Sequence, residues 1–280
     1  MFSEKTILLT GATHGIGNYI ARHLCNNNAK LILVSRNIHE LILLNNDIDK
    51  NNNNLYFALD VSDSIAVENL FNRLEKQNII LDAIINCAGT FGTIGTIYDV
   101  SPNEFNESFK TNLVGPYNTI FYGLKLINKK IRSKIINFSG GGATNPFPNY
   151  SSYSCSKISL VKLTENLAEE LKDIDVNIIA PGFIKTRLAL QTINAGKKAG
   201  NFLYKTLDML KDGGVDISHT LDLISFLLSK ESDLITGKII SAPWDNWKSP
   251  NFQKKLKSDK NFCTLRRIDE KNFIQLNFNK

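Results

Sequence analysis

Tyr153 and Lys157 are the two residues whose types and spacing most directly suggest chemistry. They lie four positions apart, so a helix over residues 153–172 would place both side chains on one face. A free phenol, with a pKa near ~10, is a poor acid or base at neutral pH. A nearby ammonium group favours the phenolate and lowers that pKa. The pair could then exchange a proton with a carbonyl or carbinol oxygen.

A second chemical signal is the glycine-rich segment TGATHGIG at residues 10–17, which joins a strand-like run to a helical stretch. Gly11 permits a tight turn, Gly15 lets the backbone approach a pyrophosphate, and Gly17 lets helix and strand pack closely. The helix N-terminus adds free N–H groups and a positive dipole end. We predict a dinucleotide loop, the alternative being a plain strand–helix turn. Its candidate binding residues are Gly11, Thr13, His14, Gly15, Ile16 and Gly17.

The next strand-like run ends in Ser35-Arg36-Asn37, where an NAD site usually carries an acid for the ribose 2′-hydroxyl. No acid is present. Arg36 can instead face a 2′-phosphate, with Ser35 and Asn37 donating hydrogen bonds and His14 adding partial positive charge. The segment therefore favours NADP(H) over NAD(H), although Arg36 could also be a solvated surface residue.

Short apolar runs alternate with longer amphipathic stretches along most of the chain. Continuously apolar strands separated by helices indicate a parallel sheet covered on both faces, so we expect an α/β fold with a doubly wound sheet of about seven strands. The expected strands are Thr6–Leu9, Lys30–Val34, Leu55–Ala58, Ala83–Asn86, Lys134–Phe138, Val176–Ala180 and Lys238–Ser241. The expected helices are Gly15–Asn27, Ile38–Asp49, Asp63–Lys76, Pro102–Asn128, Tyr153–Lys172 and Ile217–Ser229.

Charge and length divide the chain into a body and a tail. We expect one catalytic domain over residues 1–243, with a helical lid at 187–216 that is too long for an ordinary connection. Residues 244–280 form an extension that packs on its own domain or on a neighbouring subunit, because Trp244 and Trp247 need burial. Residues 248–280 hold nine Lys/Arg against three acids, so they carry the whole net charge of +6.

Composition excludes several classes of protein. Hydrophobic residues make up 42% and charged residues 21%, which suits a globular chain rather than a disordered one. The neutral body is poor evidence for nucleic-acid binding. No apolar run approaches the roughly 18 residues of a membrane helix, and no signal-peptide pattern opens the sequence. Four cysteines without CxxC spacing argue against a zinc site and fit the reduced cytoplasm, where we expect the protein.

With these motifs in order, the sequence resembles the short-chain dehydrogenase/reductase family, in its non-extended branch. The resemblance covers about residues 4–241 and implies a Rossmann-type fold. Its individual motifs are common, but their ordered combination is specific. The matching features are TGATHGIG, Asp60-Val61, Asn86-Cys87-Ala88-Gly89, Asn112, YSCSK at 153–157, and Pro181-Gly182-Phe183-Ile184-Lys185-Thr186.

The resemblance implies a role for each of these positions. Tyr153 would be the proton donor or acceptor, and Lys157 would also hold the nicotinamide ribose. Asn112 would hold a water that links Lys157 to solvent, unless its side chain is satisfied within its helix. Asp60 would bind the adenine amino group beside Val61, although a helix N-cap role is an alternative for it. Asn86, Ala88 and Gly89 would line the cofactor and support the central strand. The remaining cofactor contacts would come from Pro181, Gly182, Ile184 and Thr186.

The sequence departs from the family pattern thirteen residues before the tyrosine. The family has a serine there that polarises the substrate carbonyl, and this chain has Gly140. Losing such a donor typically costs about 10²–10³ in rate. Ser139 can take this role because three glycines give the loop latitude. The alternatives are a backbone N–H of the glycines or a hydroxyl of Thr144, Ser151 or Ser152.

These features predict an NADP-dependent oxidoreductase that transfers hydride between the cofactor and a carbonyl or secondary alcohol. Tyr153, Lys157, Ser139 and Asn112 are its predicted catalytic residues. A phosphorylated or nucleotide-linked sugar would explain the basic tail, where Arg266 and Arg267 could bind a phosphate. The main alternative is a catalytically weak NADP(H)-binding sensor or scaffold, which Gly140 favours. An extended-branch epimerase or dehydratase is disfavoured by the loop spacing and the short tail. We expect no metal, no membrane and no nucleic-acid partner, and a homodimer or homotetramer.

Overall fold

The computed structural model describes residues 2, 5–49 and 53–267. Within them, seven parallel strands form one sheet in the order β3-β2-β1-β4-β5-β6-β7. The order reverses between β1 and β4, so the predicted doubly wound α/β fold is confirmed. The strands are β1 (Thr6–Thr10), β2 (Lys30–Ser35), β3 (Leu55–Ala58), β4 (Ala83–Asn86), β5 (Ser133–Phe138), β6 (Ile174–Ala180) and β7 (Ile239–Ser241).

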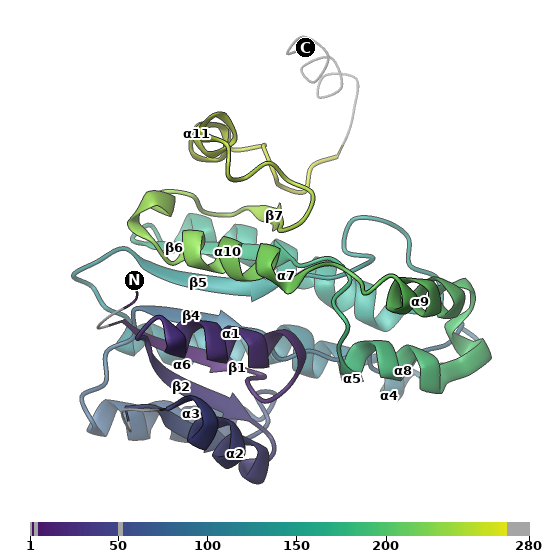
Figure 1. Cartoon of the computed structure of the whole chain (residues 1–280), viewed down its shortest axis with the longest axis horizontal. Coiled ribbons are helices and arrows are strands. Elements are labelled where there is room, and N and C mark those ends of the chain that lie inside the picture. Colours follow the sequence, from purple (N-terminus) through teal and green to yellow (C-terminus); the bar gives the residue numbers. More distant parts are fainter. Residues whose placement is uncertain (1, 3–4, 50–52, 268–280) are drawn as a thin grey trace.

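Helices cover both faces of the sheet, because alternate strand residues point to opposite sides and both sets are apolar. One core packs α1 (Gly15–Asn26), α2 (Ile38–Ile48) and α10 (Ile217–Leu227) on the sheet. The other packs α3 (Ser64–Lys76), α6 (Gly115–Gly123) and α7 (Ser151–Glu170) on the opposite face (Figure 1). The sheet is therefore buried on both sides, and function is left to the loops at its edges.

The predicted long helix over residues 102–128 is wrong as a single element. It is divided at Pro116, which lacks an N–H and whose ring crowds the carbonyl of residue 112. A π-helical turn just before the proline absorbs this misfit. The segments are α4 (Pro102–Phe105), α5 (Glu107–Phe109), the π-helix Lys110–Val114, α6 and a 3₁₀ turn at Leu124–Leu126.

The segment that we predicted to be a helical lid contains α8 (Arg187–Ala195), a 3₁₀ turn at Gly196–Ala199 and α9 (Asn201–Lys211). Figure 1 shows α8 and α9 beyond the carboxyl ends of the strands. The segment is tied to the loop before α7, since Tyr150 Oη donates to Thr192 Oγ1 at 2.9 Å and Asn149 Nδ2 donates to the Lys198 carbonyl at 2.8 Å. The segment therefore forms one wall above the carboxyl ends of the strands.

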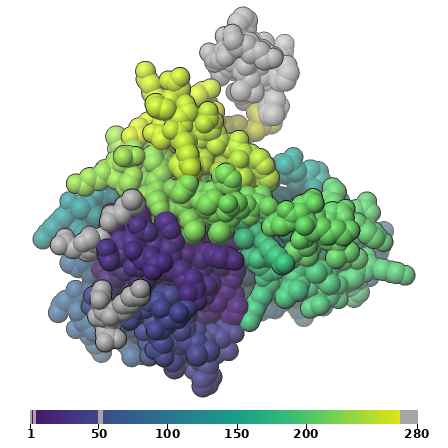
Figure 2. Space-filling model, in the orientation of Figure 1, coloured from purple at the N-terminus to yellow at the C-terminus, as the bar shows by residue number. Residues whose placement is uncertain are grey.

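The described part of the tail packs on its own chain, as Figure 2 shows in yellow, and Figure 1 places it beside β7. It contains α11 (Pro250–Ser258), which the sequence analysis did not predict, while residues 268–280, with Asp269 and Glu270, lie outside the described residues. The Cys263 carbonyl accepts a hydrogen bond from Ile239 N at 2.8 Å, so the tail covers the edge strand. Trp247 is buried and stacks on Phe226 at 5.7 Å.

Two expectations about the tail concern Trp244 and Arg266. Trp244 is 72% exposed in the single chain, so its own domain does not bury it, and burial on a neighbouring subunit stays a prediction. Arg266 does not face a ligand site but pairs with Glu165 near the end of α7, with its Nη1 3.1 Å from Oε2. This end of α7 is remote from Tyr153, near the start of the same helix, so Arg266 lies away from the predicted chemistry.

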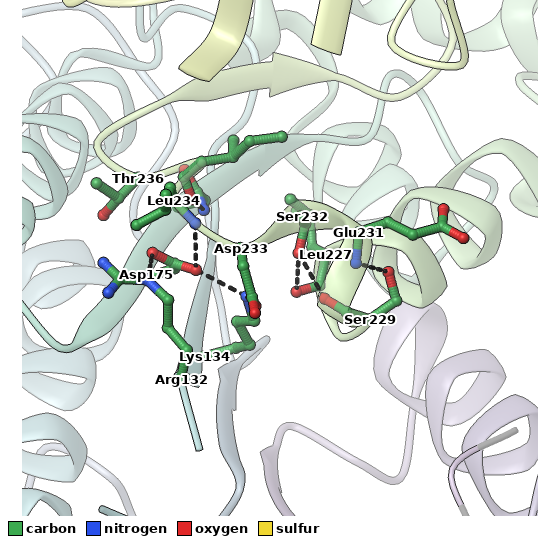
Figure 3. A network of polar contacts seen from close by, with 12 residues as sticks. Arg132, Lys134, Asp175, Leu227, Ser229, Glu231, Ser232, Asp233, Leu234 and Thr236 are labelled. Atoms are coloured by element: carbon green, nitrogen blue, oxygen red, sulfur yellow. Dashed lines mark hydrogen bonds and ion pairs between the residues drawn. The ribbon is translucent and has the colours of Figure 1, made fainter. Parts of the chain in front are cut away.

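The amino ends of β5 and β6 are joined by a buried charge network, drawn in Figure 3. Lys134 and Asp175 are cross-strand partners, and their Nζ and Oδ2 atoms lie 2.7 Å apart. Lys134 also contacts Asp233 at 2.6 Å, and Arg132 Nε lies 2.7 Å from Asp175 Oδ1. The network connects the sheet to the loop before β7. It lies at the amino ends of the strands, whereas α8 and α9 lie beyond the carboxyl ends.

Candidate active site

A cavity of about 950 Å³ lies at the carboxyl ends of the strands, next to the β1/β4 reversal where such sheets bind ligands. Its walls include the loops after all seven strands and residues of α8 and α9. Three predicted site residues do not line it: Asn37, Asn86 and Asn112. Those that line it are Gly11, Thr13, His14, Gly15, Ile16, Gly17, Ser35, Arg36, Asp60, Val61, Ala88, Gly89, Ser139, Tyr153, Lys157, Pro181, Gly182, Ile184 and Thr186.

The glycine loop has the geometry of a phosphate cradle. Gly11 and Gly15 have φ of 67° and 51°, which side chains disfavour. A Cβ on Gly17 would lie 2.1 Å from the Gly11 carbonyl oxygen. His14, at the N-cap of α1, makes no side-chain cap, which leaves this end of the helix dipole open to an anion. These residues fit a dinucleotide pyrophosphate.

At the end of β2, the three predicted 2′-phosphate ligands have different surroundings. Arg36 is exposed and lines the cavity, while Ser35 Oγ lies 2.8 Å from Thr13 Oγ1. Asn37 is instead the N-cap of α2, where its Oδ1 accepts from His39 N at 3.0 Å. The helix end uses its oxygen, and Asn37 does not line the cavity, so its predicted donation to a 2′-phosphate stays a prediction.

His14 also differs from expectation. Burial lowers the pKa of its imidazole, an effect that Glu40 opposes and Arg187 reinforces. Glu40 Oε1 lies 3.2 Å from His14 Nε2. The ring is therefore uncharged at neutral pH, and Arg36 is left as the cation that the sequence analysis assigned to the phosphate.

Asp60 and Val61 both line the cavity after β3. Asp60 Oδ1 accepts hydrogen bonds from the Ser62 backbone at 2.9 Å and the Ser62 hydroxyl at 2.8 Å. The N-cap of α3 is Asp63, so the alternative capping role for Asp60 is wrong. The adenine contact stays a prediction.

Asn86 lies inside the sheet rather than at the cavity. Its Nδ2 donates to Asn137 Oδ1 at 3.0 Å, and its Oδ1 accepts from Thr119 Oγ1 at 2.6 Å. The amide therefore ties β4 to β5 and to α6, which is the predicted support of the central strand, and its cofactor contact stays a prediction. Thr10, which sequence reasoning missed, accepts from the N–H groups of Cys87 and Ala88 and so holds the loop after β4 at the cavity.

Tyr153 and Lys157 are both 4% exposed, on the first turns of α7. Lys157 Nζ donates to the Phe138 carbonyl at 2.7 Å and lies 5.9 Å from the Tyr153 ring centroid. Burial raises the pKa of Tyr153, so the predicted lowering is wrong in this structure. Burial also lowers the pKa of Lys157 to about 8, although Cys87 raises it. The phenol is therefore held protonated.

Gly140 is the residue that meets the phenol. A Cβ at position 140 would lie 1.8 Å from Tyr153 Oη, so this placement of the hydroxyl requires the glycine. Ser139 lines the cavity nearby, and its buried hydroxyl has no hydrogen-bond partner within the described part of the chain. Such an unpaired hydroxyl is costly to bury, which suits a donor awaiting a ligand. Of the alternatives, Thr144 lines the cavity, whereas Ser152 hydrogen-bonds to Ser108 and the Phe105 carbonyl.

Asn112 lies in the π-helical turn, and its amide bridges two segments. Its Oδ1 accepts from Thr90 N at 3.0 Å, and its Nδ2 donates to the Thr90 carbonyl and to Ser156 Oγ, each at 2.9 Å. Its partners thus lie outside its own helix, contrary to the alternative that it is satisfied there. The amide holds the loop after β4 against α7, and the water-binding role stays a prediction.

An aromatic wall, defined as Phe91, Phe147, Tyr150 and Phe202, surrounds Tyr153 and was missed in the sequence. The rings of Phe91 and Tyr153 meet edge to face, with centroids 4.7 Å apart. Phe147 lies 6.4 Å from Tyr153 and 4.7 Å from Phe202 of α9. These residues come from three separate segments, so no local spacing could have revealed them. The reacting end of the cavity is therefore largely apolar.

The comparisons with known proteins agree with this geometry. The family model described as short chain dehydrogenase matches residues 5–197, so the chain belongs to that family of oxidoreductases. An uncharacterized oxidoreductase of Schizosaccharomyces pombe is 29% identical over 256 residues, covering 88% of this chain and 98% of its own. An NADPH-dependent pterin aldehyde reductase of Arabidopsis thaliana is 26% identical over 66% of this chain and 77% of its own.

A solved structure is also similar. YwfH, an NADPH-dependent reductase involved in bacilysin biosynthesis, matches with a TM-score of 0.74 and 27% identity, over 86% of this chain and 97% of its own. In the described part of our chain, no helix is both long and apolar enough to cross a membrane.

Proposed function

We propose that this protein is an NADP(H)-dependent reductase that transfers hydride to the carbonyl carbon of a small molecule. The observation that carries the proposal is the shared cavity, which has the glycine cradle at one part and the buried Tyr153–Lys157 pair at another. A bound nicotinamide would supply the hydride. Two of the similar proteins are described as NADPH-dependent reductases, which supports both the reaction and the cofactor.

In this proposal Tyr153 donates the proton that the reduced oxygen needs. Its raised pKa keeps the phenol protonated before reaction. The charged form of Lys157, anchored on the Phe138 carbonyl, stabilises the phenolate that forms. Ser139 would direct its free hydroxyl at the substrate oxygen, and Asn112 would position the loop that carries Gly89 and Thr90.

The pKa of Lys157 gives a pH prediction for carbonyl reduction. Because that pKa is lowered to about 8, the ammonium is present below this pH and lost above it, whereas the phenol stays protonated throughout. We expect kcat to fall as pH rises through about 8, measured as NADPH oxidation at saturating cofactor from about pH 6 to about pH 10. A kcat that stays flat or rises over this interval would remove Lys157 from the charge-stabilising role.

Arg36 gives a prediction for cofactor choice. Replacing Arg36 with Leu removes the cation at the end of β2 and should weaken NADPH binding about 10–100-fold while changing NADH binding less than about threefold. Calorimetric titration with both nucleotides measures the difference. Arg22→Leu, at a position on α1 that does not line the cavity, is the matched control. Equal losses for the two nucleotides would exclude a 2′-phosphate contact.

The proposed function itself is tested by titration with NADPH and NADH, followed by NADPH oxidation with a panel of ketones and aldehydes. Tight NADPH binding with turnover supports the reductase. Absence of binding to either nucleotide would overturn it. Gly140, in place of the usual serine, favours a second candidate, an NADP(H)-binding sensor or scaffold without turnover. Tight binding with no turnover across the panel would favour that candidate.

The basic tail predicted a phosphorylated or nucleotide-linked sugar as substrate, but the described residues of the tail do not support such a substrate. Neither Arg266 nor Arg267 lines the cavity. Arg266 is paired with Glu165. The walls near Tyr153 are aromatic, which favours an apolar substrate body.

A further inference from the structure

Asp245 is a carboxylate in the cavity wall, and none of the residues that the structure describes places a cation against it. It follows β7 and lines the cavity together with Ser241 and Trp244. Its Oδ2 accepts a hydrogen bond from Ser241 N at 2.7 Å, and within the described residues it forms no ion pair. Asp245 is partly buried, and burial raises its pKa. An unpaired charge in such a place costs free energy that a bound cation would offset.

The other charges of the cavity lie elsewhere or are already paired. Arg187 contacts Glu40 of α2 at 3.4 Å, toward the glycine loop and β2. Lys110 is paired with Glu107 at 2.9 Å. Among the described lining residues at the β6–β7 end, Asp245 is the one formal charge. This end of the cavity therefore attracts cations and repels phosphates.

Trp244 adds a second feature of a cation site. Its side chain is 72% exposed yet lines the cavity, and its Cη2 lies 3.5 Å from the position of a Cβ on Gly182. An exposed indole beside a carboxylate offers an aromatic face and a negative charge to the same ligand group. Indole faces attract ammonium groups by about 0.5–2 kcal/mol.

The strand order sets the distance between this place and the reacting end. Tyr153 Oη lies against Gly140, just after β5, and Asp245 follows β7, two strands further along the sheet. Because neighbouring strands are about 4.8 Å apart, the ends of β5 and β7, next to which the two places lie, are separated by about 10 Å. That is the length of a small molecule with a ring between its two functional groups, and the aromatic wall suits such a ring.

We propose that Asp245 and Trp244 form a subsite for a protonated amine of the substrate, so that the protein reduces amino ketones or amino aldehydes with an apolar spacer. This inference rests on the proposed reductase function and names its substrate class. In the forward direction hydride reaches the carbonyl carbon, Tyr153 gives its proton to the oxygen, and the distant ammonium group stays unchanged.

The test uses three forms of benzylacetone that differ in the para substituent: aminomethyl, ethyl and carboxymethyl. Binding to the full chain is measured by calorimetry with and without NADPH, and reduction is measured as NADPH oxidation. We expect the aminomethyl ketone to bind and react about tenfold better than the ethyl ketone, and the carboxymethyl ketone to be the weakest. Asp245→Asn should reduce the preference to about twofold or less, since the amide keeps the acceptor for Ser241 N but loses the charge.

Asp47→Asn, which removes an exposed charge on α2 outside the cavity, should keep the full preference. Three results would overturn the subsite. They are equal affinities and rates for the aminomethyl and ethyl ketones, a preference for the amine that survives Asp245→Asn, and no binding of any probe. Reduction of all three probes at equal rates would contradict the subsite but support the proposed reductase function. If the amine binds in a way that depends on Asp245, but NADPH neither binds nor is oxidised, the subsite is supported and the proposed reductase function is contradicted.

Discussion

Replacing Tyr153 with Phe should lower kcat for carbonyl reduction by about 10²–10⁴-fold and leave NADPH affinity within about twofold. The change removes only the phenolic hydroxyl group, which carries the proton. The phenyl ring can keep its contacts with Phe91 at 4.7 Å and Phe147 at 6.4 Å, so the fold of the site is preserved. The measurement is NADPH oxidation with the best carbonyl compound of the panel, accompanied by calorimetric titration of the cofactor.

Tyr150→Phe is the matched control for this prediction. Tyr150 is equally buried in the aromatic wall, stacks on Phe147 and donates its hydroxyl to Thr192 rather than facing Gly140. Its loss should cost about tenfold or less in kcat, as expected for a single hydrogen bond away from the reacting atoms. A Tyr153→Phe variant as active as Tyr150→Phe would remove Tyr153 from the role of proton donor.

Gly140→Ala reaches the same hydroxyl from the other side. The added methyl would lie 1.8 Å from Tyr153 Oη. Phe91 and Phe147 pack against the Tyr153 ring, so rotation of the ring in place does not relieve the clash. The phenol must therefore shift from its place in the cavity. The usual family serine at this position would face the same conflict, so Gly140 and the position of Tyr153 belong together.

The fold was predictable wherever the signal was local. Strands such as Ala83–Asn86 are apolar up to their last residue because both faces of the sheet are covered, and their predicted bounds agree with the structure within one or two residues. The failures have physical causes. Helical periodicity continued through Pro116, so the division of the predicted long helix was missed, although the proline itself was the signal. The helix of the tail was also signalled, by Ser249 at the N-cap and Pro250 at the first helical position.

The site was predictable in its backbone-dominated parts and less so where side chains compete for partners. The glycine loop follows from its spacing alone, and it lines the cavity as predicted. Asn86 and Asn37 do not line the cavity, because each amide has a structural partner, a strand neighbour in one case and a helix end in the other. Asp245 was not singled out, because only the strand order brings the end of β7 to the cavity that holds Tyr153.

We expect the buried charge network at the amino ends of β5 and β6 to make a large contribution to the free energy of unfolding. Asp175 is almost fully buried and accepts from Arg132, Lys134 and the Leu234 N–H (Figure 3). Replacing Asp175 with Asn keeps the shape but leaves buried cations under-compensated. The free energy of unfolding should fall by about 3–5 kcal/mol. In a chain of this size we expect Tm to drop by about 6–15 °C, measured by scanning calorimetry.

Lys125→Met provides the comparison, because Lys125 pairs with Glu75 at 2.9 Å on the surface, where both side chains are at least 36% exposed. Its loss should cost less than about 1 kcal/mol, since water and salt already screen the pair. The two effects differ in access to water. Water cannot replace the carboxylate of Asp175 beside the buried Lys134, whereas it hydrates the exposed Glu75 once Lys125 is removed. If Asp175→Asn melts within about 2 °C of Lys125→Met, the buried network contributes no more than a surface pair, and the loop before β7 is held by apolar packing instead.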